Sequence, residues 1–167
     1  MLSVGDGFDL SSALTGAGIV PPTSIRGIRL GITKAQVREI LGKPEKIERY
    51  AGGPVARYVY GLTTISFFRD SQRVQIVSTR SPGVRTKDGI GTGSLLNAVD
   101  ASAGTKCEKW LDEIPDDGFT VREWHQECVV DGNGVRMTFY FPVSYDGPQN
   151  ASSKVSQVIL WPDSDAK

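Results

Sequence analysis

A short glycine-rich motif occurs twice in this chain, and the duplication constrains the fold more than any other sequence feature. The first copy, residues 27–44, reads GIRLGITKAQVREILGKP, and the second, residues 89–104, reads GIGTGSLLNAVDASAG. Five residues of the first copy recur at an offset of 62: Gly27, Ile28, Gly31, Val37 and Gly42 match Gly89, Ile90, Gly93, Val99 and Gly104. A constant offset predicts a duplicated structural unit.

Each copy of the motif predicts a short helix. In the first, Thr33 and Gln36 form a capping box that starts the helix, and Gly42 followed by Pro44 ends it. Its apolar residues fall at helical spacing and form one stripe: Val37, Ile40 and Leu41. The second helix is expected to start at Ser94 and to end at Gly104, with these apolar residues: Leu95, Leu96, Val99 and Ala103.

Three strand-like runs follow each helix. In the first half they are VARYVYG, TISFFRD and VQIVSTR, and in the second FTVREWHQECVV, GVRMTFYFPV and KVSQVILWP. Their β-branched and aromatic content, with short turns between them, predicts antiparallel meanders. The offset grows to 81 between Val74 and Val155, so we expect the insertions 107–118 and 144–153 to be loops.

The predicted fold class is therefore α+β, with two tandem repeats that each consist of a short helical segment and an antiparallel β-meander. The two sheets are expected to join, with the helices on one face. The expected division is a flexible N-terminal arm (1–24), repeat 1 (25–84), repeat 2 (85–162) and a tail (163–167).

The stretch LGITKAQVREILGKP is similar to the opening G-M-T-x-x-Q-V-x-x-x-x-G-x-P that small outer-membrane assembly lipoproteins share with secreted β-lactamase inhibitor proteins. The resemblance implies a helical segment followed by an antiparallel meander. The tandem duplication, with a cysteine pair in its second copy, looks more like the inhibitor proteins. Ile32 replaces the usual methionine, and the second copy lacks the Thr-x-x-Gln box. Because the motif does not align the inhibitors' contact residues, none is transferred.

Cys107 and Cys128 are the only two cysteines. A bond between them would close a loop of 21 residues and stabilise the fold by roughly 3 kcal/mol. The alternative is two unrelated buried thiols. A third interpretation is a metal site that includes His125, but the sequence lacks the paired C-x-x-C spacing of such sites. We favour the disulfide, which indicates an oxidising compartment.

Charge and hydropathy exclude several classes of partner. Nineteen basic and nineteen acidic residues give no net charge, and the absence of basic blocks disfavours nucleic-acid binding. No apolar run approaches the ~20 residues of a membrane span, and the first residues lack the pattern of a signal peptide. The chain is then either cytosolic or a mature domain without its targeting segment. The cysteine pair favours a secreted, periplasmic or cell-envelope protein.

His125 is the only histidine and lies between Glu123 and Glu127, which share its face in a strand. An imidazole beside carboxylates can act as a base, yet no nucleophile motif accompanies it, so we favour a polar strand face. The acidic stretch 112–117 matches no calcium loop, and the glycines of GIGTGS lack a phosphate-binding lysine. We therefore predict no enzyme activity, no metal and no cofactor.

The remaining candidate is a binding surface. Alternation in VRMTFYF places Arg136 and Tyr140 opposite the apolar side chains of the same strand. Together with other aromatic residues they would form a surface of the composition that protein interfaces favour: Tyr58, Tyr60, Trp124 and Trp161. The alternative is that these aromatics are buried between sheet and helices.

The sequence thus predicts a non-enzymatic protein-binding module, inhibitor-like as one option, that uses the open sheet face or the loops. An envelope-assembly component is the alternative, and a hydrolase that uses His125 is a weaker one.

Overall fold

The computed structural model describes residues 21–49, 56–68, 71–102 and 104–163 of the 167-residue chain. Most of the predicted N-terminal arm (1–24) and of the tail (163–167) lies outside the described residues. The elements in chain order are β1 (Ser24–Ile25), β2 (Ile28–Arg29), α1 (Lys34–Leu41), β3 (Lys46–Arg49), β4 (Ala56–Tyr60), β5 (Thr63–Phe67), β6 (Ile76–Thr79), α2 (Leu96–Asp100), β7 (Lys106–Asp116), β8 (Phe119–Gly132), β9 (Val135–Tyr140) and β10 (Gln157–Pro162).

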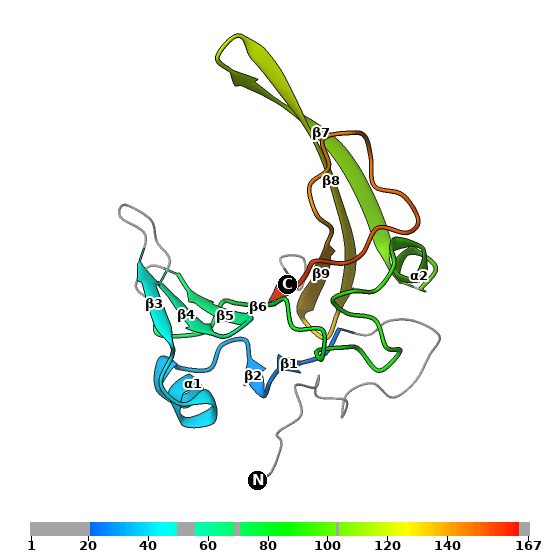
Figure 1. The fold of residues 1–167 in the computed structure, drawn as a ribbon. Helices are drawn as coiled ribbons and strands as arrows, with labels where there is room; N and C mark the ends of the chain where they lie inside the picture. The colour runs from blue at the N-terminus through cyan, green and yellow to red at the C-terminus, as the bar shows by residue number, and fades with distance from the viewer. Residues whose placement is uncertain (1–20, 50–55, 69–70, 103, 164–167) are drawn as a thin grey trace.

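One antiparallel sheet of eight strands dominates the molecule (Figure 1). Its strand order is β3-β4-β5-β6-β10-β9-β8-β7, and β1 and β2 pair separately as a small ladder. The last strand in the chain, β10, lies between β6 and β9, so it joins the strands of the first half to those of the second.

The predicted fold class, α+β with two tandem helix-plus-meander repeats, is wrong. The protein is mostly β, with 49% of the described residues in strands and 10% in helices. The eight-residue α1 and the five-residue α2 are too short to form a helical layer over the sheet. Strand structure also extends into segments without a strand prediction, Lys46–Arg49 and Lys106–Asp116. The boundaries at residues 84/85 and 162/163 stay predictions.

The first motif forms the predicted helix. Thr33 Oγ1 accepts a hydrogen bond from the Gln36 backbone N–H, and Gln36 Oε1 accepts one from the Thr33 backbone N–H. This capping box satisfies two amides at the start of α1 that would otherwise lack a partner. Gly42 ends the helix with φ = 80°, in a region that glycine adopts without strain.

The second motif differs at its helix start. The N-cap of α2 is Leu95 rather than Ser94, and no side chain caps it. Ser94 Oγ instead accepts a hydrogen bond from the Gly91 backbone N–H in the preceding turn. The helix also stops at Asp100, before Gly104, and Ala103 lies outside the described residues.

The shared glycines of the two motifs have a local explanation. Gly31 has φ = 83° and donates its backbone N–H to the carbonyl of Val74, at 2.7 Å. Gly93 has φ = 89° and donates to the carbonyl of Val155, at 2.8 Å. Each motif is thus anchored by the same backbone contact to a segment just before a strand, and a residue with a side chain would be strained at either glycine.

The segment 107–118, predicted as a loop, is most of strand β7 and its turn. β7 pairs with β8 over eleven residue pairs, from Lys106–Val129 to Asp116–Phe119. Asp117 and Gly118 form the turn with φ of 37° and 90°, the conformation that Asp-Gly favours in two-residue hairpins. The resulting two-stranded ribbon projects beyond the other strands and curves back over the sheet (Figure 1).

The predicted disulfide is confirmed. Cys107 and Cys128 are bonded, and they are direct cross-strand neighbours on β7 and β8. Phe139 on β9 is the next residue in this row and is fully buried.

The hydrophobic core lies on the convex side of the sheet, where α1, β1 and β2 also pack (Figure 1). One core row crosses six strands through Tyr58, Ile65, Val77, Leu160, Met137 and Val130. Because side chains alternate along each strand, the residues between these core positions point to the opposite, concave side. That side is covered by neither helix (Figure 1).

Candidate binding surface

The concave side of the sheet carries a groove of about 500 Å³. Strands β3, β4, β5, β6 and β10 build it, and their alternation places every second side chain in it. Its lining residues are Glu48, Arg57, Val59, Gly61, Thr64, Ser66, Ile76, Ser78, Arg80, Gln157, Ile159 and Trp161. The groove thus combines aliphatic, hydroxyl, aromatic and charged groups, a composition that suits the binding of another protein.

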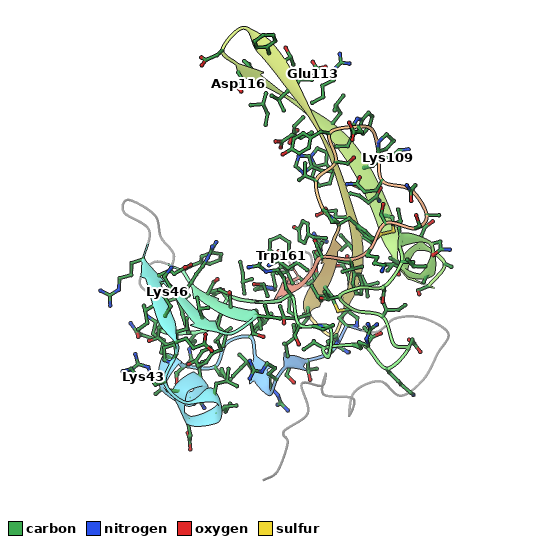
Figure 2. The ribbon with its side chains drawn as sticks, viewed as in Figure 1. Lys43, Lys46, Lys109, Glu113, Asp116 and Trp161 are labelled. Carbon is green, nitrogen blue, oxygen red and sulfur yellow. A yellow bond between two sulfur atoms is a disulfide. The ribbon has the colours of Figure 1, made fainter. Side chains whose placement is uncertain are left out.

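Trp161 lies centrally on the concave side (Figure 2). Its indole Nε1 donates a hydrogen bond to Thr138 Oγ1 on β9, at 3.0 Å. Because the polar edge of the ring is held by a buried hydroxyl, the apolar body of the ring has a fixed orientation toward the groove.

Tyr140 lies on the same side of the sheet, directly across from Glu127 of β8. Burial, the charge of Glu127 and a hydrogen bond to that carboxylate together raise the pKa of the Tyr140 phenol to about 12, with burial the largest cause. The phenol is therefore a neutral hydrogen-bond donor fixed by a carboxylate at all physiological pH values.

Arg136 of β9 also lies on the concave side, directly opposite Trp161 of β10. Its guanidinium forms a two-pronged ion pair with Asp131, with distances of 2.7 Å from Nε to Oδ1 and 3.2 Å from the second nitrogen to Oδ2. The pair is half-exposed, and its geometry holds Arg136 in place.

Three of the six predicted surface residues lie on the other side. Tyr58 and Tyr60 are buried on the core side: the Tyr58 hydroxyl accepts a hydrogen bond from Arg38, and the Tyr60 hydroxyl donates one to the Gly42 carbonyl. Trp124 lies two and four residues before the buried Gln126 and Cys128 on β8. Because every second side chain of a strand points to the same side, Trp124 shares their face. The concave side keeps Arg136, Tyr140 and Trp161.

The ribbon of β7 and β8 extends the concave side. Its side chains alternate between an inner face, which continues the concave side, and an outer face, which continues the core side. Figure 2 shows Asp116 and Glu113 pointing to opposite sides of the ribbon. The inner face consists of five cross-strand pairs: Glu108–Glu127, Trp110–His125, Asp112–Glu123, Ile114–Val121 and Asp116–Phe119.

His125 lies in the middle of this inner face. Its ring stacks on Trp110 with a centroid distance of 5.1 Å and an angle of 7°. Its Nε2 is 3.2 Å from Asp112 Oδ2 and 3.6 Å from Glu123 Oε2, but the alignment forms no hydrogen bond. The predicted neighbour Glu123 is thus close, and Asp112 takes the place expected for Glu127.

No group of three or more histidine, cysteine or acidic side chains in the described part of the chain has a geometry that fits a metal ion. A second pocket, of about 350 Å³, lies at the turn between β4 and β5, on the other side from the concave groove, and includes Arg26, Tyr60 and Leu62. It brings together no recognisable catalytic set.

Most of the groove was not predicted from the sequence. Arg57, Ser78 and Ile159 were not singled out, although the alternation with the core residues Tyr58, Val77 and Leu160 would have placed them on the open face. The inner face of the ribbon was not predicted either, although the dipeptide Asp117-Gly118 is a hairpin signal in the sequence.

None of the helices in the described residues has the length and apolar character needed to cross a bilayer.

Comparisons with known proteins identify similar folds but no family. No family model matches the chain, and no curated protein matches it either. Two solved structures are similar. An extracellular protein containing an SCP domain from Bacillus anthracis str. Ames has a TM-score of 0.52 at 12% identity, with 80% of this chain covered. A DUF4309 family protein, YjgB, from Bacillus subtilis subsp. subtilis str. 168 has a TM-score of 0.50 at 14% identity.

The extents of the two matches differ. This chain spans 44% of the length of the Bacillus anthracis protein, whereas the match with YjgB covers 87% of this chain and 88% of the other. At such identities the likeness concerns the fold alone. Neither description mentions a β-lactamase inhibitor or an assembly lipoprotein, so that resemblance stays a prediction.

Proposed function

We propose that this chain is a secreted, non-enzymatic protein-binding module that holds a protein partner against the concave side of its sheet. The observation that carries the proposal is the groove with Trp161 in its wall: a fixed aromatic ring that lines one concavity together with aliphatic, hydroxyl and cationic side chains. Binding energy at protein interfaces concentrates on such aromatic anchors in partly enclosed sites.

Two observations support the extracellular setting. The disulfide between Cys107 and Cys128 fits an oxidising compartment, and one of the similar structures is described as an extracellular protein. A periplasmic or cell-envelope location, with a role as an inhibitor or as an assembly component, is a finer form of the same proposal.

A hydrolase that uses His125 is less well supported. The contacts of this ring are Trp110 and the carboxylates of Asp112 and Glu123. A catalytic base of that type acts on a hydroxyl, a thiol or a bound water held within hydrogen-bond reach, and His125 lies on an open ribbon rather than in a concave pocket.

The test is site-specific photo-crosslinking. A photoreactive phenylalanine replaces Ser78 in the groove or, as the control, the exposed Thr120 on the outer face of the ribbon. Both proteins are irradiated in the culture medium of the source organism. We expect a defined adduct from position 78 and none from position 120.

The partner that is identified in the adduct is then made recombinantly, and it should bind the unmodified chain. We expect Trp161→Ala or Tyr140→Ala to weaken this binding by about 1–4 kcal/mol. Adducts from both positions alike, or equal affinity of both variants and the unmodified chain, would refute the concave side as the binding surface.

A further inference from the structure

The inner face of the β7–β8 ribbon has a one-sided charge. Its five cross-strand pairs, from Glu108–Glu127 to Asp116–Phe119, carry five carboxylates and neither lysine nor arginine: Glu108, Asp112, Asp116, Glu123 and Glu127. The outer face of the same segment is mixed, and there Arg122 pairs with Glu113 at 3.1 Å. A chain with no net charge has thus concentrated negative charge on one face of a projecting element.

These carboxylates repel one another within the folded chain. Glu108 lies directly opposite Glu127, and Asp112 lies directly opposite Glu123. Like charges in direct cross-strand positions destabilise a sheet. Within the described residues, none of the five forms an ion pair with a lysine or an arginine. The repulsion between these carboxylates therefore destabilises the isolated protein. A cationic partner would replace the repulsion by attraction.

Apolar side chains alternate with these carboxylates along the ribbon. The cross-strand pairs read acid–acid, Trp110–His125, acid–acid, Ile114–Val121 and Asp116–Phe119. Three of these apolar side chains are large and exposed: Phe119 is 80% exposed, Ile114 43% and Trp110 38%, while Val121 is half-buried. Exposed apolar groups of this size, close together on one element, indicate a contact surface.

We propose that the inner face of the ribbon binds a cationic protein segment in which lysine or arginine residues alternate with apolar ones. This rests on the proposed function and names the chemistry of its partner. The carboxylates Glu108, Asp112 and Asp116 recur every four residues along β7, about 13 Å apart. A partner in extended conformation would therefore present its cations at the same spacing, with an apolar residue between them.

Charge complementarity favours this occupant over the other candidates. Nucleic acid and anionic membrane surfaces would be repelled by the five carboxylates. A second copy of this chain is the competing occupant, because the groove itself carries Arg57 and Arg80. The experiment separates these two outcomes.

The experiment uses a random linear peptide library displayed on phage, selected against the immobilised whole chain. The selected peptides are then measured as free peptides against three variants. One has the inner face neutralised by Glu108→Gln, Asp112→Asn and Asp116→Asn; the second has the outer-face change Glu113→Gln; and the third has the groove change Trp161→Ala. Circular dichroism checks the fold of each.

We expect selected peptides rich in lysine or arginine, with affinities that fall as salt is raised. The inner-face variant should bind about tenfold or more weakly, and Glu113→Gln should bind as the unmodified chain does. Peptides without net positive charge, or equal binding by the inner-face variant, would overturn the proposal.

Two further outcomes also decide the matter. Peptides that lose affinity only with Trp161→Ala would overturn the ribbon proposal and leave the proposed function standing. Analytical ultracentrifugation that shows a dimer of the unmodified chain, dissociated in the inner-face variant, would also overturn it, because the ribbon would then hold a second copy.

Discussion

The indole nitrogen of Trp161 donates a hydrogen bond to the hydroxyl of Thr138 across the boundary between β10 and β9. Thr138 is fully buried although it lies on the concave side of the sheet, so the tryptophan ring covers it. This contact links the floor of the groove to the half of the sheet that carries the ribbon.

The first prediction concerns this hydrogen bond. Trp161→Phe keeps an aromatic ring but leaves the Thr138 hydroxyl without its partner, which should lower the free energy of unfolding by about 1–3 kcal/mol. Urea denaturation followed by circular dichroism measures the loss. In the Thr138→Val variant, Trp161→Phe should lower the free energy of unfolding by less, since no hydroxyl is then left unpaired. An equal loss of free energy with and without Thr138→Val would contradict the hydrogen bond between Trp161 and Thr138.

The second prediction concerns the disulfide. The unreduced protein should be lighter than the reduced protein by two hydrogen atoms in intact-mass analysis, because Cys107 and Cys128 are bonded. Replacing both cysteines by alanine should lower the free energy of unfolding by about 3 kcal/mol. Two thiols that react with an alkylating agent without prior reduction would count against the bond and against the extracellular setting.

A third prediction concerns Gly91, in the connection between β6 and α2. A Cβ atom at this position would lie 2.3 Å from the carbonyl oxygen of Val84, so the backbone must move in Gly91→Ala. We expect a loss of about 1–3 kcal/mol, as for other overpacked sites, visible as a lower melting temperature. The exposed neighbour Asp88 is the control, and Asp88→Ala should melt close to the unmodified protein.

Repulsion on the ribbon gives the fourth prediction. Glu108→Gln removes one of two carboxylates that face each other across β7 and β8, and should raise the free energy of unfolding by about 0.2–1 kcal/mol. Glu113→Gln breaks an exposed ion pair with Arg122 and should lower it by at most about 1 kcal/mol. Both effects should shrink in high salt, and the same sign for both variants would be inconsistent with the charge arrangement.

The fifth prediction concerns the Tyr140 phenol, whose pKa is raised to about 12 by burial and by Glu127. Since the folded pKa lies above the ordinary tyrosine value of 10.0, the neutral phenol stabilises the fold fully below pH 10, and this contribution is lost as the pH rises toward 12. Ultraviolet absorbance of phenolate follows the titration. Glu127→Gln should lower the Tyr140 pKa only partly, because burial is the larger cause; an unchanged pKa would exclude Glu127 as a contributor.

The local signals in the sequence predicted local structure well. The capping box at Thr33 and Gln36 formed as expected, because its hydrogen bonds join residues three positions apart. The cysteine pair was also predicted correctly. The α+β class was wrong because the length of α2 and the extension of β7 depend on tertiary pairing, which overrides local propensity. Pro115 and the surrounding charges resembled a loop, yet an edge strand tolerates both.

The candidate surface was predicted less well than the helix. Arg136 and Tyr140 were predicted opposite the apolar side chains of their strand, where they lie, whereas the faces of Tyr58, Tyr60, Trp124 and Trp161 were left open. Tyr58 and Tyr60 are buried against α1. Alternation shows that two residues share a face but not which face meets the core, and an aromatic residue suits either environment. For Tyr58 the deciding contact comes from Arg38, twenty residues earlier in the chain.

The position of the disulfide determines how the ribbon responds to load. Among the described strands, β7 is the outermost of the sheet, and β8 is its only neighbour. A pull on the tip would separate the two strands one residue pair at a time, as a zipper opens, since each step breaks few hydrogen bonds. The covalent bond at Cys107 and Cys128, next to the first pair of β7, stops this unzipping at the root of the ribbon. Force applied at the tip then reaches the buried row that contains Phe139, and the core of the whole sheet resists it.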